Sequence, residues 1–251
     1  MEYGLIGEKL GHSFSKEIHE KLADYTYDLC PLTKDEFNDF MKKKDFKSIN
    51  VTIPYKRDVI PYLESMDDSA RAIGAVNTIV NRDGKLYGYN TDMPGFIYMV
   101  NKNNITIKDK KVVVLGNGGA AQAIKAAVQK LEAAEMIVVD VLLTEGVISY
   151  EECFEKHTDA EIIINTSPVG MFPNVDASPV DLTHFPKCGA VLDVIYNPLT
   201  TKLVAQAREL GMIGVTGLEM LVAQAKYAVE IFLDTKIDES EIDCIYREMI
   251  S

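Results

Sequence analysis

A lysine and an aspartate are the polar residues best placed to carry chemistry. Lys56 ends the stretch INVTIPYK, and Asp92 ends the stretch GYNTD. Each follows an expected strand, and ligand crevices in open α/β sheets form at strand ends. An ammonium group held in place by a carboxylate can donate a proton to a nearby substrate oxygen. The alternative is that Lys56 is a solvated charge after its strand and that Asp92 is a helix N-cap.

The strand expected before Lys56 alternates in polarity. Apolar residues at positions 49, 51 and 53 alternate with Asn50 and Thr52, and Pro54 follows. This pattern is typical of a strand with one face on the core. We therefore expect Asn50, Thr52 and then Lys56 to face something polar.

Four further polar residues could contact a ligand. Ser13 and Ser15 stand at an expected helix N-terminus, where two hydroxyls either cap the helix or bind a carboxylate. Asn77 lies among strand apolars, and Gln224 lies at the edge of an apolar helix face. Their amides must find partners, which are either backbone and water or a polyhydroxy ligand.

His12 beside Ser13 suggests nucleophilic catalysis at first sight. The chain has no G-x-S-x-G elbow, and adjacent residues rarely meet as base and nucleophile. We discount that reading.

A glycine-rich loop predicts a dinucleotide site. Gly116, Gly118 and Ala121 satisfy the pattern G-x-G-x-x-G/A between an apolar strand and an alanine-rich helix. Such glycines allow a tight turn and a close approach of backbone to pyrophosphate. Asp140 ends the next apolar strand, where an acid can bind the adenosine ribose. The alternatives are a purely structural turn and an ordinary acid at a strand end.

Alternating strand and helix signals in the first hundred residues predict a mainly parallel sheet covered on both faces. The expected strands lie at 3–7, 27–32, 49–53, 75–80 and 85–89, the last two as a hairpin turned at 81–84. The first expected helix starts at Ser13 or Ser15 and runs to Leu22. Further helices are expected at 33–44, 58–65 and 67–73.

The polar segment 101–109 is the expected boundary to a second α/β domain. Its strands are expected at 111–115, 136–142, 162–165, 191–195 and 212–215, with a helix at 120–131. A long helix after Gly217 and a short one at 239–249 cannot extend that sheet. We expect a domain at 1–100, a Rossmann-like domain at 101–216, and helices at 217–251 that pack back on the first domain.

The bulk composition bounds the function. The 251 residues are 47% hydrophobic and carry a formal charge of −12, which argues against nucleic acid and anionic membranes as partners. No apolar run approaches a bilayer span, and the N-terminus does not resemble a signal peptide. The four cysteines form no C-x-x-C pair, so we expect no metal and a reducing, cytoplasmic location.

Taken together, these stretches resemble one family, the shikimate dehydrogenases. The resemblance runs nearly end to end, through GLIGEKLGHSFS (4–15), INVTIPYK (49–56), IGAVNTIV (73–80), GYNTD (88–92), LGNGGAAQA (115–123), INTSPVGM (164–171), DVIYNP (193–198) and GLEMLVAQA (217–225).

The resemblance implies two α/β domains with a cleft between them and reversible reduction of 3-dehydroshikimate to shikimate by a nicotinamide cofactor. It makes Lys56 and Asp92 the catalytic pair. It assigns substrate binding to Ser13, Ser15, Thr52, Asn77, Tyr196 and Gln224. It assigns cofactor binding to Gly116, Asn117, Gly118, Gly119, Ala120, Asp140, Val194 and Gly217.

The sequence departs from the family pattern where the cofactor is chosen. The family default is NADP, whose 2′-phosphate is neutralised by the arginine of an Asn-Arg-Thr segment. Here Asp140-Val141-Leu142 stands in its place, and Gln122 replaces a common arginine, although Lys125 could supply a charge. An aspartate would repel the phosphate and favour NAD. A smaller departure is Lys16, where a proline is common.

Two other functions stay open. One is an NAD-dependent quinate/shikimate dehydrogenase, and the other is a non-catalytic dinucleotide-binding protein, which the presence of both Lys56 and Asp92 disfavours. The expected partner is a small-molecule substrate, and the chain is expected to be a monomer or a homodimer.

Overall fold

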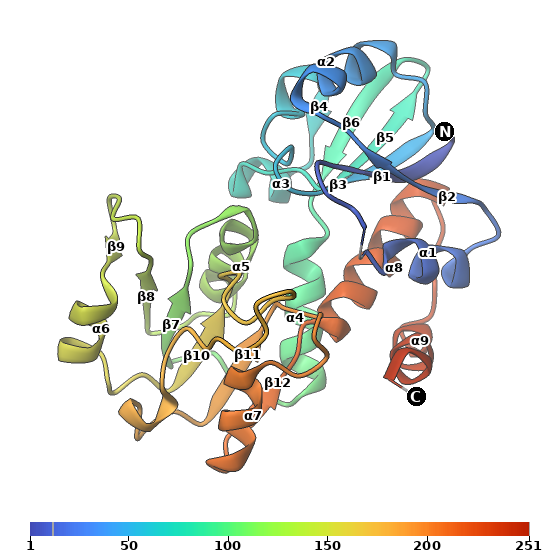
Figure 1. Ribbon diagram of the computed structural model, residues 1–251. Coiled ribbons are helices and arrows are strands. Elements are labelled where there is room, and N and C mark those ends of the chain that lie inside the picture. The colour runs from blue at the N-terminus through green and yellow to red at the C-terminus, as the bar shows by residue number, and fades with distance from the viewer. Residues whose placement is uncertain (12, 251) are drawn as a thin grey trace. The chain divides into compact units, whose positions relative to one another are not determined.

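The computed structural model describes residues 1–11 and 13–250 (Figure 1). It divides into two compact units, Met1–Gly95 with Leu221–Ser251, and Phe96–Met220. Each unit contains one six-stranded sheet with helices, so the predicted α/β class with two sheets is confirmed.

The first unit is built on a mixed, parallel-rich sheet in the order β2-β1-β3-β5-β6-β4. β1 is parallel to β2 and β3, whereas β5 is antiparallel to β3 and β6. The predicted hairpin is confirmed, although its first strand covers Thr78–Arg82 rather than the expected 75–80, and Asp83 and Gly84 have φ values of 51° and 82° in its turn. The elements are β1 (Tyr3–Gly7), α1 (Ser15–Leu22), β2 (Tyr27–Pro31), α2 (Lys34–Lys43), β3 (Ser48–Val51), a 3-10 turn (Ile60–Tyr62), β4 (Ser65–Met66), α3 (Asp68–Ile73), β5 (Thr78–Arg82) and β6 (Lys85–Tyr89).

The expected alternation before Lys56 is wrong. β3 is a central strand between β1 and β5 that stops at Val51, and all four of its residues are buried, so neither of its faces is open to solvent. Asn50 is 5% exposed, whereas Ile53, expected in the strand's apolar face, is 67% exposed.

The expected helix at 58–65 is also mostly wrong. The chain forms only the 3-10 turn Ile60–Tyr62 and then enters β4. Pro61 is compatible only with the first turn of a helix, and the Glu64 N–H donates to Leu86 O at 2.8 Å instead. Pairing with β6 therefore replaces the helix.

The second unit is a parallel sheet in the order β12-β11-β10-β7-β8-β9. β7 and β10 are buried on both faces, as is usual for strands inside a parallel sheet. The elements are β7 (Lys111–Leu115), α5 (Gly119–Lys130), β8 (Glu135–Val139), β9 (Val147–Ile148), α6 (Tyr150–Lys156), β10 (Ile162–Asn165), a 3-10 turn (Leu182–His184), β11 (Ala190–Asp193), α7 (Lys202–Glu209) and β12 (Ile213–Val215).

Several differences from the sequence-based expectations concern this unit. The strand expected at 191–195 ends at Asp193. The strand expected at 136–142 ends at Val139, so Asp140 lies just past it. α6 and α7 were not expected, although Thr201 caps α7 by accepting the Val204 N–H at 3.3 Å. A threonine before a helical apolar pattern is a usable sequence signal for that helix.

Two helices continue from one unit into the other along the chain, α4 (Asp92–Lys102) and α8 (Leu218–Leu233). α9 (Ser240–Ile250) lies beside α1 in the first unit, where Lys21 pairs with Glu248 at 2.6 Å (Figure 1). None of the helices in the described residues has the length and apolarity to cross a membrane.

Candidate functional site

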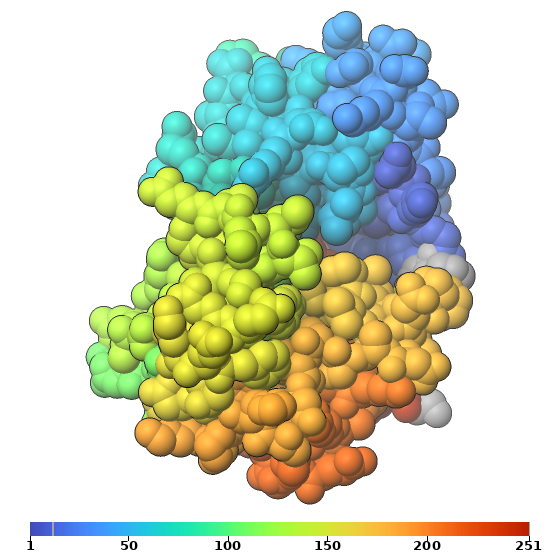
Figure 2. Space-filling view, turned by 60° about the vertical axis from the view of Figure 1, so that its left-hand side comes forward, coloured from blue at the N-terminus to red at the C-terminus, as the bar shows by residue number. Residues whose placement is uncertain are grey.

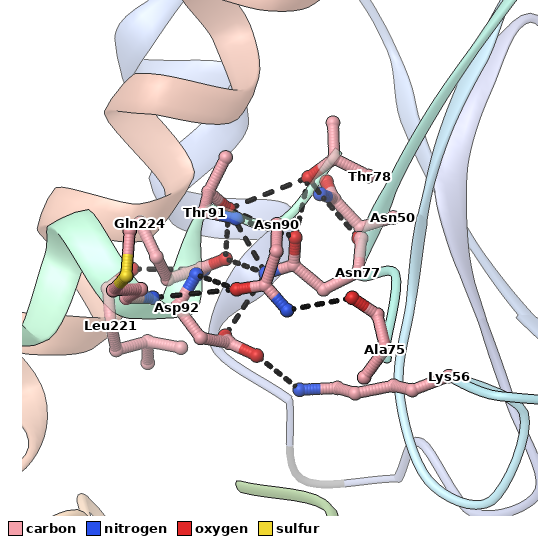
Figure 3. Close-up of polar contacts among 11 residues, drawn as sticks. Asn50, Lys56, Ala75, Asn77, Thr78, Asn90, Thr91, Asp92, Leu221 and Gln224 are labelled. Carbon is pink, nitrogen blue, oxygen red and sulfur yellow. Dashed lines mark hydrogen bonds and ion pairs between the residues drawn. The ribbon is translucent and has the colours of Figure 1, made fainter. Parts of the chain in front are cut away.

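Lys56 and Asp92 form an ion pair in the first unit (Figure 3). Lys56 Nζ lies 2.6 Å from Asp92 Oδ2, and the two side chains are 15% and 10% exposed. The Lys56 carbonyl accepts the Val76 N–H at 2.8 Å, which holds the lysine backbone beside the start of β5. Lys56 is therefore not a solvated charge, and the expected proximity to Asp92 is confirmed.

Asp92 is the first residue of α4 and is not its cap. The Asn90 side chain accepts the N–H groups of Asp92 and Met93 at 3.1 and 3.3 Å, and it donates to Ala75 O at 3.0 Å. Because Asn90 caps the helix, the Asp92 carboxylate can bind side chains. Sequence reasoning did not single out Asn90, although an asparagine before a helix is a recognised capping signal.

Asn77 holds the other oxygen of the carboxylate. Its Nδ2 donates to Asp92 Oδ1 at 2.9 Å, and its Oδ1 accepts the Thr91 N–H at 2.8 Å. Gln224 joins through Oε1, which lies 3.4 Å from both Asn77 Nδ2 and Thr91 Oγ1 (Figure 3). Asn77 thus contacts Asp92 directly, whereas Gln224 is linked to it only through Asn77 and Thr91, and both amides find protein partners.

A second layer of buried polar groups lies behind Asn77. Asn50 accepts the Tyr27 hydroxyl at 2.7 Å and donates to Asn77 O and to Thr78 Oγ1, each at 3.1 Å. The Thr78 hydroxyl donates to Asn77 Oδ1 at 2.9 Å. Asn50 therefore supports the site from inside the sheet, and the polar surroundings expected for it are groups of the protein itself.

The predicted hydroxyls come from the start of α1 and from the residue after β3. Ser15 begins α1 and is buried, and Ser13 is half-buried with its Oγ accepting the Ser15 N–H at 3.2 Å. The N-cap of α1 is Phe14, so neither serine is the N-cap. Thr52 follows β3 and is half-buried. Across the described residues, none of these three hydroxyls hydrogen-bonds to Lys56 or Asp92, and His12 lies outside the described residues.

The glycine-rich loop of the second unit has the geometry of an anion site. Gly116 has φ of 96°, and a Cβ there would lie 2.8 Å from the Ser167 nitrogen, so a side chain is excluded. Gly118 is the N-cap of α5 and provides no side-chain cap. A Cβ on Gly118 or Gly119 would meet nothing within 4 Å, which leaves open space over the first turn of the helix. These features fit a dinucleotide phosphate.

Asp140 binds this loop directly. Its Oδ2 accepts the Asn117 N–H at 2.6 Å, and its Oδ1 accepts the Leu142 N–H at 2.9 Å. The Asn117 side chain in turn accepts Lys125 Nζ at 2.8 Å and Gln122 Nε2 at 3.3 Å. The Asp140 carboxylate therefore contacts the backbone of Asn117, and the Lys125 ammonium group contacts its side chain.

The segment after Asp140 is apolar and exposed. Val141, Leu142 and Leu143 are 80%, 74% and 63% exposed. The part of the chain around β8, β9 and α6, drawn yellow-green in Figure 2, reaches the surface of the second unit.

The remaining predicted residues lie beyond β11 in the second unit. The Gly217 N–H donates to Ile195 O at 2.9 Å, and a Cβ at Gly217 would overlap the Val194 carbonyl. This close approach requires a glycine. Tyr196 is half-buried, and burial raises the pKa of its phenol. Tyr196 thus belongs to the second unit, whereas the other predicted substrate residues belong to the first.

Metal ligands do not gather anywhere in the described part of the chain. Residues 1–11 and 13–250 contain no group of three or more His, Cys, Asp or Glu side chains arranged to hold a metal ion.

Comparisons with known proteins point to one family. The family model described as the shikimate dehydrogenase substrate binding domain matches residues 5–79. A protein from Clostridium perfringens named shikimate dehydrogenase (NADP(+)) is 38% identical over 98% of this chain and 97% of its own length.

Solved structures give the same result. A chorismate mutase/shikimate 5-dehydrogenase fusion protein from Clostridium acetobutylicum is 38% identical, with a TM-score of 0.90 over 98% of this chain and 96% of that one. The shikimate 5-dehydrogenase of Thermus thermophilus, in complex with NADP(H) and shikimate, is 27% identical, with a TM-score of 0.88 over 99% of both chains.

Proposed function

This chain belongs to the shikimate dehydrogenase family, and from that premise we propose that it catalyses the reversible, nicotinamide-dependent reduction of 3-dehydroshikimate to shikimate. The observation that carries the proposal is the Lys56–Asp92 pair, in which Asn77 holds the second oxygen of the carboxylate. The substrate belongs to the pathway that makes aromatic amino acids.

Lys56 meets the chemical demand of ketone reduction. The nicotinamide cofactor, when bound, supplies or accepts the hydride. Reduction leaves negative charge on the former carbonyl oxygen, which needs a proton donor or a positive charge nearby. The Lys56 ammonium provides both, and Asp92 keeps it in one place. In the oxidation direction, the same lysine takes the hydroxyl proton as the neutral amine and becomes the ammonium.

Hydroxyl and amide side chains of the first unit suit a polyhydroxy acid. We assign the substrate carboxylate to Ser13 and Ser15, and the substrate hydroxyls to Thr52, Asn77 and Gln224. Asn77 and Gln224 support this assignment because they already lie in the network around Asp92. Tyr196, in the second unit, is assigned as a further substrate contact.

The two units take different roles in this proposal. Residues 1–100 bind substrate, residues 101–216 bind the dinucleotide, and helices at 217–251 pack on the substrate domain. The grouping of Leu221–Ser251 with Met1–Gly95 supports the third assignment. In the dinucleotide domain, Gly116, Asn117, Gly118, Gly119 and Ala120 hold the phosphates, and Val194 and Gly217 line the nicotinamide end.

We further propose that the preference for NADP is weakened and that NAD is used. The relative from Clostridium perfringens is named shikimate dehydrogenase (NADP(+)). In this chain, however, Asp140 stands beside the phosphate loop, and its negative charge would repel a 2′-phosphate. Lys125, held at Asn117, is the residue that could reverse this preference.

One set of assays tests the proposal. The purified chain is given shikimate and, separately, quinate, each with NADP and with NAD. Oxidation of shikimate supports the proposal, and no oxidation with either cofactor would refute it. A higher kcat/KM for quinate with NAD would favour the catabolic enzyme, and a large advantage of NADP over NAD would refute the cofactor proposal.

A further inference from the structure

Asp193 is a buried carboxylate at the end of β11 to which the proposed reaction assigns no role. Its side chain is 0% exposed. Oδ1 accepts Asn165 Nδ2–H and the Ile195 N–H, each at 3.0 Å, and Oδ2 accepts the Thr201 hydroxyl at 2.8 Å. All three donors are neutral.

Keeping such a carboxylate is costly. Burial raises the pKa of Asp193 to about 6, although the three hydrogen bonds lower it. An uncharged side chain would avoid the cost of burying charge. Only a carboxylate, however, offers acceptor sites to three separate donors without adding a donor of its own.

The three donors belong to three different segments. Asn165 ends β10, and its Oδ1 accepts the N–H and the hydroxyl of Ser167 at 3.0 and 2.7 Å. Ile195 belongs to the segment after β11. Thr201 caps α7. One buried carboxylate therefore joins the turn after β10, the segment after β11 and the start of α7.

These segments lie at the carboxyl ends of strands on one side of a topological switch point. β7, which leads into the glycine-rich loop, has β8 on one side and β10, followed by β11, on the other. A dinucleotide binds across such a point, with one mononucleotide half on each side. Asp140, the residue expected to bind the adenosine ribose, follows β8. The adenosine half therefore belongs on the β8 side, and the nicotinamide half belongs over the ends of β10 and β11.

The segment after β11 is also held from elsewhere. The Gly217 N–H donates to Ile195 O at 2.9 Å, and the Phe172 N–H donates to Asn197 O at 3.0 Å. Residues 194–197 are thus supported by backbone contacts, and Asp193 anchors both ends of the segment 195–201 through Ile195 and Thr201.

We propose that Asp193 is a positioning residue whose carboxylate shapes the surface that receives the nicotinamide half of the cofactor. It holds segment 194–201 and the Asn165–Ser167 turn in place without touching the cofactor itself. This inference rests on the proposed function only in so far as the second unit binds a nicotinamide dinucleotide.

Asp193→Asn tests the inference, because the amide keeps the size of the side chain but turns one acceptor into a donor. Binding to the full chain is measured by calorimetry with two probes. One is the nicotinamide dinucleotide that the unaltered protein binds more tightly. The other is the matching ADP-ribose, with or without the 2′-phosphate, which lacks nicotinamide. We expect the variant to bind the dinucleotide about tenfold more weakly and the ADP-ribose about equally well.

Asp181→Asn is the matched control. Asp181 is an exposed aspartate of the same unit that also accepts a backbone N–H, from Thr183, and bonds to α7 through Gln206. Its replacement should change the affinity for neither probe.

Two results would overturn the inference: unchanged affinity for the dinucleotide, or an equal loss of affinity for both probes. Thermal unfolding shows whether Asp193→Asn folds. If Asp193→Asn does not fold, Thr201→Val is measured in the same way, because this change removes the hydroxyl that donates to Asp193. Thr201→Ser keeps the hydroxyl and should bind both probes as the unaltered protein does. No shikimate is present in these experiments. A protein that binds dinucleotide but does not oxidise shikimate therefore refutes the proposed function alone.

Discussion

Asn77 donates a hydrogen bond of 2.9 Å to Asp92 Oδ1, the carboxylate oxygen opposite to the one that Lys56 contacts. The orientation of the Asn77 amide is determined by its other partners, because its Oδ1 accepts the Thr91 N–H at 2.8 Å and the Thr78 hydroxyl at 2.9 Å. Both oxygens of Asp92 are thereby engaged. Asn77 therefore fixes the orientation of the Asp92 carboxylate, and the carboxylate in turn fixes the position of the Lys56 ammonium.

Asn77→Ala should therefore damage both stability and turnover. The Thr91 N–H loses a buried acceptor, which lowers the free energy of unfolding by about 1–3 kcal/mol. Asp92 loses one of the two groups that orient it, so we expect kcat to fall by about tenfold or more. Urea unfolding and steady-state kinetics measure the two effects.

Asn81→Ala is the control for this change. Asn81 lies on β5, the strand that begins just after Asn77, and bonds to the carbonyls of Lys44 and Phe46 at 2.8 and 3.0 Å, away from the ion pair. The Asn81→Ala variant should have a lower free energy of unfolding but an unchanged kcat. Full kcat in folded Asn77→Ala would show that Asn77 does not orient the pair.

Lys56→Ala should remove the proton-transfer group. We expect kcat to fall by about 10²–10⁴-fold, the usual contribution of a positioned acid or base. The dissociation constant for shikimate, measured by calorimetry, should change little, because hydroxyl and amide groups provide most of the proposed contacts. Lys85→Ala removes an exposed lysine paired with Glu64 and should behave as the unaltered protein does. Residual activity near the unaltered level would show that Lys56 has another role.

Asp140→Asn should shift the cofactor preference toward NADP. The change removes the charge that faces a 2′-phosphate but keeps an oxygen for the Asn117 N–H. We expect the ratio of kcat/KM for NADP to that for NAD to rise by about tenfold. Asp159→Asn changes an exposed acid of the same unit, paired with Lys111 at 2.8 Å, and should leave the ratio unchanged. If Asp140→Asn also leaves it unchanged, Asp140 does not select the cofactor.

His19 predicts a specific loss of stability in acid. It is 0% exposed and stacks on Tyr27 with ring centroids 4.0 Å apart, and burial lowers the pKa of its imidazole to about 3. In the unfolded chain the His19 imidazole takes up a proton near pH 6.5, whereas in the folded protein it stays neutral down to about pH 3. The stability that comes from neutral His19 is therefore complete above pH 6.5 and is lost as the pH falls toward 3.

His19→Gln should therefore lose less stability than the unaltered protein between pH 7 and pH 4, by roughly 3 kcal/mol. Urea unfolding at several pH values measures this difference. His184→Gln replaces an exposed histidine and should follow the unaltered protein. Parallel pH curves for His19→Gln and the unaltered chain would contradict the prediction.

Much of the site could be predicted from local sequence. Lys56 after a strand and Asp92 at a helix start are local features, and the glycines at 116 and 118 mark a strand-to-helix turn in any context. Asn77, expected within a strand, lies just before β5. The reason is physical: backbone conformation depends first on neighbouring residues, and the ends of parallel strands meet at one edge of a sheet. These local rules place Lys56 and Asp92 at strand ends, and the structure shows that the two side chains meet.

Other features depended on contacts between residues far apart in the sequence. Asn50 was expected to face something polar, and the polar groups it meets belong to the protein: β3 is buried on both faces, and Asn50 bonds to Tyr27 and Thr78. The acceptor role of Asp193 likewise required Asn165 and Thr201 to meet it. Local sequence determined which residues end each strand. Only the tertiary structure decided which of those residues bond to one another, because a buried polar group must pair with whatever the packing of the sheet places beside it.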